Sequence, residues 1–202
     1  MALHIRFQPS TEMPTGSRAR EAERLALADR ECLHLRFGEP CDPRQLREFY
    51  DVVDLVETFT DYARFLQQPV DAAAAQLADL DGWSGFTVSR TQWEHVILVN
   101  PCHAQVRRTL TIAHEFGHLV HGHRPLYVSH LGGCLEETRF SDAQELEANS
   151  YSLALLLPYA PLTQLLDQGA TYPAIALHYG VSVEAVEMRL KLVGLWSNRT
   201  SR

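Results

Sequence analysis

Two histidines and a glutamate lie close together in the middle of this 202-residue chain, in the run His114-Glu115-Phe116-Gly117-His118. On an α-helix, residues four apart lie on the same face, so His114 and His118 can direct two imidazoles at one metal ion. Glu115 lies beside them, at an offset that suits a general base, which accepts a proton from metal-bound water without binding the metal itself. This spacing predicts hydrolysis assisted by Zn2+.

An open catalytic zinc site usually has three protein ligands and a water, so a third ligand is expected elsewhere in the chain. A helical projection of residues 142–157 places Glu145 and Asn149 on one inward face. Glu145 is therefore the predicted third ligand. Asn149, one turn further on, is placed to hydrogen-bond a ligand or a ligating histidine. Glu147 is rotated by about 200° from Glu145 and is expected to face solvent.

The elements that must position these residues can be predicted from local patterns. Residues 85–89 and 95–100 are rich in β-branched and aromatic side chains and are predicted to form two strands. The helix that carries the histidine pair is predicted over residues 104–121, and a second helix over 142–157 ends at Pro158. A polar loop with Gly132 and Gly133 is expected between the two helices.

The rest of the chain is predicted to be mainly helical. The first sixteen residues have no periodicity and are expected to form a loose tail. The other expected segments are a helix over 18–36 that Gly38 ends, a short helix over 43–49, a strand-like or helical stretch over 52–59, and helices over 161–167, 172–179 and 183–192.

Composition excludes several classes of protein. The net charge is -7 with a pI near 5.8, so no basic surplus favours nucleic acid. No apolar run approaches the roughly 20 residues that span a bilayer and the N-terminus lacks a signal-peptide pattern, so neither membrane insertion nor secretion is expected and the protein is expected to be cytoplasmic. The four cysteines form no C-x-x-C pair and are expected to be reduced and mostly buried, Cys102 included.

The histidine motif, followed by Glu145-Leu146-Glu147-Ala148-Asn149 and the run to Pro158, resembles the ImmA/IrrE family of metallopeptidases. The segments 96–113 and 179–186 are similar to that family too, so the resemblance covers roughly the last two thirds of the chain. There are two departures. His121 follows the motif after two residues, where the family usually has a histidine after three, and Tyr151-Ser152 replaces the usual Phe-Ala pair.

The resemblance implies a gluzincin-like zinc endopeptidase with ligands His114, His118 and Glu145 and the general base Glu115. It also implies a partner, a helix-turn-helix repressor whose cleavage releases stress, phage or mobile-element genes. The expected fold class is α+β: a zincin-like core with a small β-sheet packed on the histidine helix, plus C-terminal helices of helix-turn-helix-like spacing. The expected domains are a tail over 1–16, a metallopeptidase domain over 17–160 and a C-terminal helical segment over 161–202.

Several alternatives stay open or are set aside on residue grounds. The longer metzincin pattern needs glycine at position 121 and histidine at 124, but the chain has His121 and Arg124, so His121 and His123 are interpreted as surface or supporting residues. The oxyanion-stabilising residue is open among the remaining histidines and three named candidates, which are Tyr127, His130 and Tyr151.

The helix-turn-helix-like segment leads to a rival hypothesis, a non-catalytic zinc-containing sensing or DNA-binding module. In its second helix Glu184 and Glu187 are poor neighbours for phosphate, and Arg189 with Lys191 compensates them weakly, so direct DNA binding is not expected. A general peptidase or toxin is the third hypothesis. The substrate, the scissile bond, the activating signal and the oligomeric state do not follow from the sequence.

Overall fold

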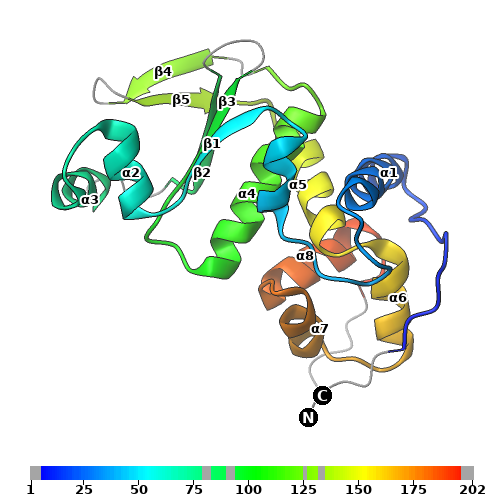
Figure 1. Cartoon of the computed structure of the whole chain (residues 1–202). Coiled ribbons are helices and arrows are strands. Elements are labelled where there is room, and N and C mark those ends of the chain that lie inside the picture. The colour runs from blue at the N-terminus through cyan, green and yellow to red at the C-terminus, as the bar shows by residue number, and fades with distance from the viewer. Residues whose placement is uncertain (1–5, 79–82, 90–93, 125–126, 132–134, 197–202) are drawn as a thin grey trace.

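The fold is α+β and mostly helical, as predicted (Figure 1). The computed structural model describes residues 6–78, 83–89, 94–124, 127–131 and 135–196. In chain order the elements are α1 Ser17–Cys32, the 3-10 helix η1 Pro43–Glu48, β1 Val52–Val56, α2 Phe59–Leu66, α3 Val70–Ala78, β2 Gly85–Ser89, β3 His95–Val99, α4 Gln105–Val120, β4 Tyr127–Leu131, β5 Leu135–Arg139, α5 Asp142–Leu156, α6 Tyr159–Asp167, α7 Tyr172–Tyr179 and α8 Val183–Leu192.

A three-stranded sheet in the order β1-β3-β2 forms the β part of the core, with β1 parallel and β2 antiparallel to β3. Side chains alternate across β3, so Ile97 and Val99 join the main core with α4, whereas Val96 and Leu98 pack with α2 and α3. All four are fully buried. Helices therefore cover both faces of the central strand, which explains its continuous apolar run.

The helices α4, α5 and α1 form successive layers beside the sheet, with α5 between the other two (Figure 1). Because α5 is covered on both sides, every residue from Ser150 to its C-terminus is buried. A capping box begins α5, in which the Ser141 hydroxyl accepts from the Gln144 N–H and the Gln144 side chain accepts from the Ser141 N–H. This local signal fixes where the helix starts and hence which residues follow on its face.

The predicted strands and the two predicted site helices are confirmed to within a residue or two. Between those helices β4 and β5 form an antiparallel pair, so the prediction of a loop is wrong for residues 127–131 and 135–139, whereas Gly132 and Gly133 lie outside the described residues. The helix predicted to end at Gly38 ends at Cys32, since His34 adopts a left-handed conformation (φ 56°) and the Leu35 N–H donates back to the Arg30 carbonyl.

The N-terminal stretch is less loose than predicted. Residues 6–16 form no helix or strand, but they run along α6 (Figure 1). The side chain of Gln164 both accepts from the Gln8 N–H and donates to its carbonyl, and Gln168 makes the same pair of bonds with Arg6. The described part of this stretch is therefore tied to the helices.

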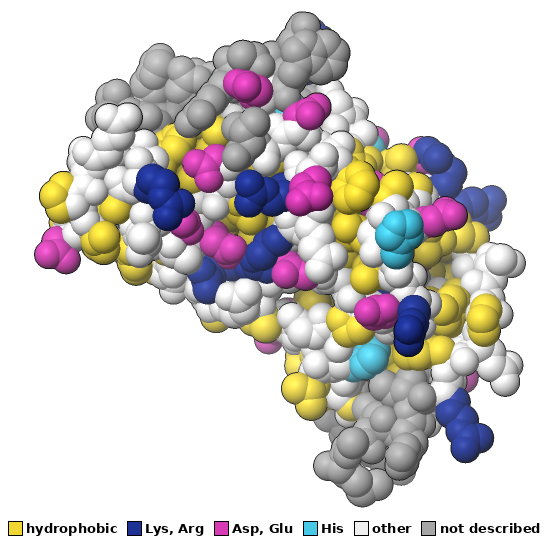
Figure 2. Space-filling model, viewed as in Figure 1, with side chains coloured by type: hydrophobic (Ala, Val, Ile, Leu, Met, Phe, Trp, Pro, Cys, Tyr) yellow, Lys and Arg dark blue, Asp and Glu magenta, His cyan; other side chains and the backbone are white. Residues whose placement is uncertain are grey.

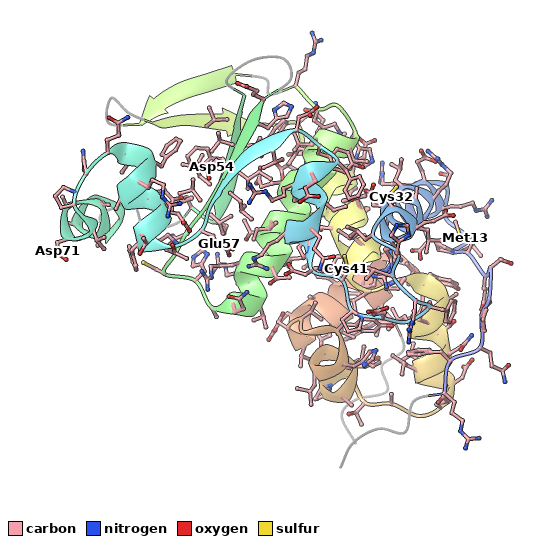
Figure 3. The ribbon with its side chains drawn as sticks, in the orientation of Figure 1. Met13, Cys32, Cys41, Asp54, Glu57 and Asp71 are labelled. Atoms are coloured by element: carbon pink, nitrogen blue, oxygen red, sulfur yellow. The ribbon has the colours of Figure 1, made fainter. Side chains whose placement is uncertain are left out.

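Of the three cysteines that the structure describes, only Cys41 is buried, so the prediction of mostly buried thiols is wrong for Cys32 and Cys102. Cys32 ends α1 and Cys41 lies just before η1 (Figure 3). Burial raises the pKa of the Cys41 thiol to about 12, which keeps it protonated and unreactive. Cys134 lies outside the described residues.

The α7–α8 pair has its positively charged side chains engaged within the protein. Arg189 of α8 is fully buried, pairs with the Glu23 carboxylate and donates from Nε to the Leu157 carbonyl over 3.0 Å. The Lys191 ammonium lies 4.5 Å from the centre of the Trp196 ring. The described helices include none that is both long and apolar enough to cross a membrane.

Candidate metal centre

The site is built where α4 and α5 approach each other closely. A Cβ added at Gly117 would lie 2.8 Å from the backbone of Ala148, so only glycine allows this helix spacing. His114 and His118 occupy the same face of α4, one turn apart, and Glu145 lies one turn before Ala148 on α5. The close helix contact therefore brings the carboxylate of one helix to the imidazoles of the other.

The three predicted ligands converge on one point. The Nε2 atoms of His114 and His118 are 3.0 Å apart, and Glu145 oxygens lie 3.3 Å from Nε2 of His114 and 3.7 Å from Nε2 of His118. Ligands about 2.0–2.1 Å from a tetrahedral zinc are separated by about 3.3 Å. The separations in this site bracket that value, so the donor set fits a zinc ion in both chemistry and size.

The hydrogen bond behind His114 fixes which of its nitrogens carries the proton. Its Nδ1 lies 3.1 Å from Oδ1 of Asn149, an oxygen that can only accept. Nδ1 therefore donates, and Nε2 presents a lone pair to the site when the ring is neutral. Asn149 thus has the contact that the sequence predicted, and it orients His114 as partners of metal-bound histidines do.

Electrostatics keep the second histidine available as a ligand. Burial and the neighbouring His114 lower the pKa of His118 to about 3, so its ring is neutral near pH 7. Burial also lowers the pKa of His114, but Glu145 and Glu115 outweigh it and raise that pKa overall. The hydrogen bond to His114 lowers the pKa of Glu145. The site therefore combines the Glu145 carboxylate with two imidazoles. That of His118 is neutral, and at His114 a metal ion would compete with a proton.

Glu115 is buried beside the predicted ligands rather than among them. Its Oε2 accepts a 2.8 Å hydrogen bond from Oγ1 of Thr87 on β2. Burial raises the pKa of Glu115, while His114 and Thr87 oppose this. A carboxylate whose pKa is raised accepts a proton readily, which suits a general base. Thr87 was not predicted as a site residue, because it comes from a strand 28 positions earlier.

The site opens into a cleft of about 350 Å³. Glu115, both histidines, Glu145 and Asn149 line its floor. Residues that the sequence did not single out form the rest of the wall, namely Ser84, Gly85, Phe86, Arg107, Leu110, Thr111 and Phe140. The first three belong to β2 or precede it directly, so an edge strand of the sheet forms one side of the cleft.

Arg107 is the polar residue of this wall with the most donors. Its guanidinium donates to Oγ of Ser84 over 2.9 Å and is exposed. Among the predicted oxyanion candidates, Tyr151 is excluded, because it is fully buried and its hydroxyl donates to Asp29 of α1. The side chains of Tyr127 and His130 lie outside the described part of the structure.

The surroundings of Glu147 differ from the prediction that this side chain faces solvent. Its side chain is 42% exposed, nearly the same as the 43% of Glu145. However, its carboxylate also accepts from His123 over 3.0 Å, so it does not simply face solvent. A projection of one helix could not predict this contact, because His123 reaches Glu147 from beyond the end of α4.

Comparison with known families agrees with this geometry. Residues 71–191 match the family model of peptidase M78, described as the IrrE N-terminal-like domain. This range contains α4, α5 and the whole convergent cluster. No curated protein and no solved structure matched the chain. Since the match covers more than half of the sequence, the chain belongs to the M78 peptidase family and has its IrrE N-terminal-like domain.

Proposed function

We propose that this protein is a zinc-dependent endopeptidase, with His114, His118 and Glu145 as metal ligands and Glu115 as general base. The observation that carries the proposal is the convergence of three donor atoms at separations of 3.0–3.7 Å, beside a buried carboxylate in a cleft. Membership of a peptidase family supports the reaction class. The donor set supports zinc, which prefers nitrogen and carboxylate ligands in this number.

In this mechanism a bound zinc would polarise a peptide carbonyl and lower the pKa of a water toward about 7. Glu115 accepts the proton of the attacking water and then donates it to the leaving amine. Thr87 holds one Glu115 oxygen through its hydroxyl, which leaves the other oxygen for the proton transfer. Asn149 holds the His114 ring in place.

The cleft wall suggests how a peptide is bound. In the described part of the sheet β2 pairs with β3 on one side, and its other edge borders the cleft. An extended peptide that adds to this edge would gain main-chain hydrogen bonds and pass its carbonyl over Glu115. This arrangement supports cleavage within an extended segment of a protein.

The proposed substrate is a transcriptional repressor of the helix-turn-helix type, whose cleavage derepresses stress, phage-defence or mobile-element genes. This part rests on the resemblance to the ImmA/IrrE family and on the IrrE N-terminal-like domain itself. Repressors commonly join their DNA-binding and oligomerisation parts by an exposed linker, and such linkers are accessible in extended form.

The experiment compares purified wild type with Glu115→Gln on a helix-turn-helix repressor encoded beside this gene. Wild type is expected to cut the repressor at one site, and Glu115→Gln to retain zinc and lose activity by at least about 100-fold, the size of a general-base contribution. Digestion of unfolded casein at many sites would favour a general peptidase or toxin instead. Equal cleavage by both proteins would contradict the proposal.

The rival of another class is a non-catalytic, zinc-containing DNA-binding or sensing module. One observation weighs against it: the described helix α8, which would read DNA, has Arg189 buried in an ion pair and Lys191 placed over Trp196. Acidic and basic side chains are also intermixed on the face that Figure 2 shows. Salt-dependent binding of wild type to duplex DNA, with no cleavage of any protein, would favour this rival.

A further inference from the structure

A chain of three hydrogen-bonding side chains runs away from the predicted metal centre behind His118. Nδ1 of His118 lies 3.0 Å from Nδ1 of His123, and Nε2 of His123 lies 3.0 Å from Oε2 of Glu147. The side chains of His118 and His123 are 3% and 6% exposed. We infer that His123 and Glu147 are positioning residues, which hold the His118 ring so that its Nε2 faces the metal.

The contacts admit one consistent assignment of protons when both rings are neutral. Glu147 ends the chain as a carboxylate, which can only accept, so Nε2 of His123 carries a proton and donates to it. Nδ1 of His123 then has a lone pair and accepts from Nδ1 of His118. His118 therefore keeps its other nitrogen, Nε2, free of a proton and directed at His114 and Glu145.

The backbone at the end of α4 explains why His123 reaches His118. Gly122 has a φ of 61°, and its N–H donates to the Leu119 carbonyl, while the His123 N–H donates to the His118 carbonyl. These two bonds are the pattern of a Schellman turn, which returns the chain over the last turn of the helix. The residue after the glycine is thereby placed against the residue five positions earlier, the second histidine of the motif.

Ring packing fixes the same two histidines from the side. Phe140 stacks on His118 with a centroid distance of 3.7 Å and an interplanar angle of 19°. His121 stacks on His123 at 5.1 Å and 22°, and the Nδ1 of His121 lies 2.8 Å from the Gly117 carbonyl. His121 therefore hydrogen-bonds to the backbone and supports His123 by ring stacking alone.

Both predicted histidine ligands are thus held by residues of α5, His114 directly by Asn149 and His118 through His123 by Glu147. A carboxylate at the far end of such a chain increases the basicity of the ligating imidazole and fixes its orientation. Loss of such a partner typically costs 10–100-fold in metal affinity. The same range is expected for Glu147 and His123, which are not themselves ligands.

The inference rests on the proposed zinc site, and the test separates the two. Zinc dissociation constants would be measured by competition with a chromophoric chelator for wild type, Glu147→Ala, Glu147→Gln, His123→Ala and the control Glu184→Ala, which lies in the first turn of α8. Glu147→Ala and His123→Ala are expected to weaken zinc binding by about 10–100-fold. Glu147→Gln keeps an acceptor oxygen and is expected to recover most of the affinity, and Glu184→Ala is expected to match wild type.

Wild-type affinity for both Glu147→Ala and His123→Ala would overturn the inference while leaving the peptidase proposal intact. Failure of the wild type to bind zinc would instead refute the proposed function. A further measurement needs no variant: nitrogen-15 NMR of the zinc-loaded wild type should show His123 with its proton on Nε2. A proton on Nδ1 of His123 would contradict the inferred chain.

Discussion

Gly117 of α4 packs directly against Ala148 of α5, so that a Cβ at position 117 would lie 2.8 Å from both the Cα and the carbonyl oxygen of Ala148. Both atoms belong to the backbone of Ala148, which cannot rotate away as a flexible side chain can. The contact sets the distance between the two helices that carry the predicted ligands. The geometry of the candidate metal centre therefore depends on a residue that has no side chain.

Gly117→Ala tests this dependence. In an unconstrained helix interior the change would stabilise the protein by about 0.5–1 kcal/mol. In this protein the steric clash is expected to dominate and to lower the free energy of unfolding by about 1–3 kcal/mol, with weaker zinc binding as α5 moves outward. Denaturant unfolding and chelator competition measure the two effects. Gly16→Ala, whose added Cβ meets only the Cβ of Ala19 at 3.9 Å, is the matched control.

Thr87→Val removes the hydroxyl that holds Glu115 and keeps the shape of the side chain. A hydrogen bond to a charged group contributes about 1.5–3 kcal/mol, so kcat is expected to fall roughly 10–100-fold. KM and zinc content should change little, because Thr87 contacts the base and no predicted ligand. Thr87→Ser keeps the donor and should retain most of the activity. An unchanged kcat in Thr87→Val would show that Glu115 needs no such support.

Arg189→Ala leaves the buried Glu23 carboxylate without its partner. Breaking a buried ion pair in this way is expected to destabilise the protein by about 3–5 kcal/mol, which denaturant unfolding measures. Lys191→Ala, on the same helix but outside the ion pair, should cost about 1 kcal/mol or less. A stable Arg189→Ala protein with reduced DNA binding would instead assign α8 to DNA recognition.

Much of this architecture could be predicted because its signals are local. The β-branched and aromatic content of 85–89 and 95–100 predicted β2 and β3, and the apolar pattern around His114 predicted α4. The capping box at Ser141 and Gln144 begins α5 at Asp142, the first residue of the helical projection. The projection then placed Glu145 and Asn149 on the side of α5 that contacts α4, and in the structure both residues lie at His114.

The remaining site residues could not be predicted because they depend on contacts between distant segments. Thr87 reaches Glu115 only once β2 has packed on α4, and no pattern around Thr87 indicates it. The β4–β5 pair has no clear strand signal in the sequence, because Gly132 and Gly133 interrupt a stretch with little alternation. The position of His123 is an exception, because it has a local signal in the sequence. Glycine at position 122 is typical of a helix end that turns the chain back, which places the next residue against the last turn of the helix.

The central claim is that His114, His118 and Glu145 hold a zinc ion, and metal content tests it most directly. Mass spectrometry would measure zinc per chain in purified wild type, Glu145→Ala and the control Glu184→Ala, whose carboxylate lies in the first turn of α8. About one zinc per chain is expected in wild type and in Glu184→Ala, with most of it lost in Glu145→Ala. A folded wild type without zinc, or a Glu145→Ala protein that keeps its full zinc, would contradict this account.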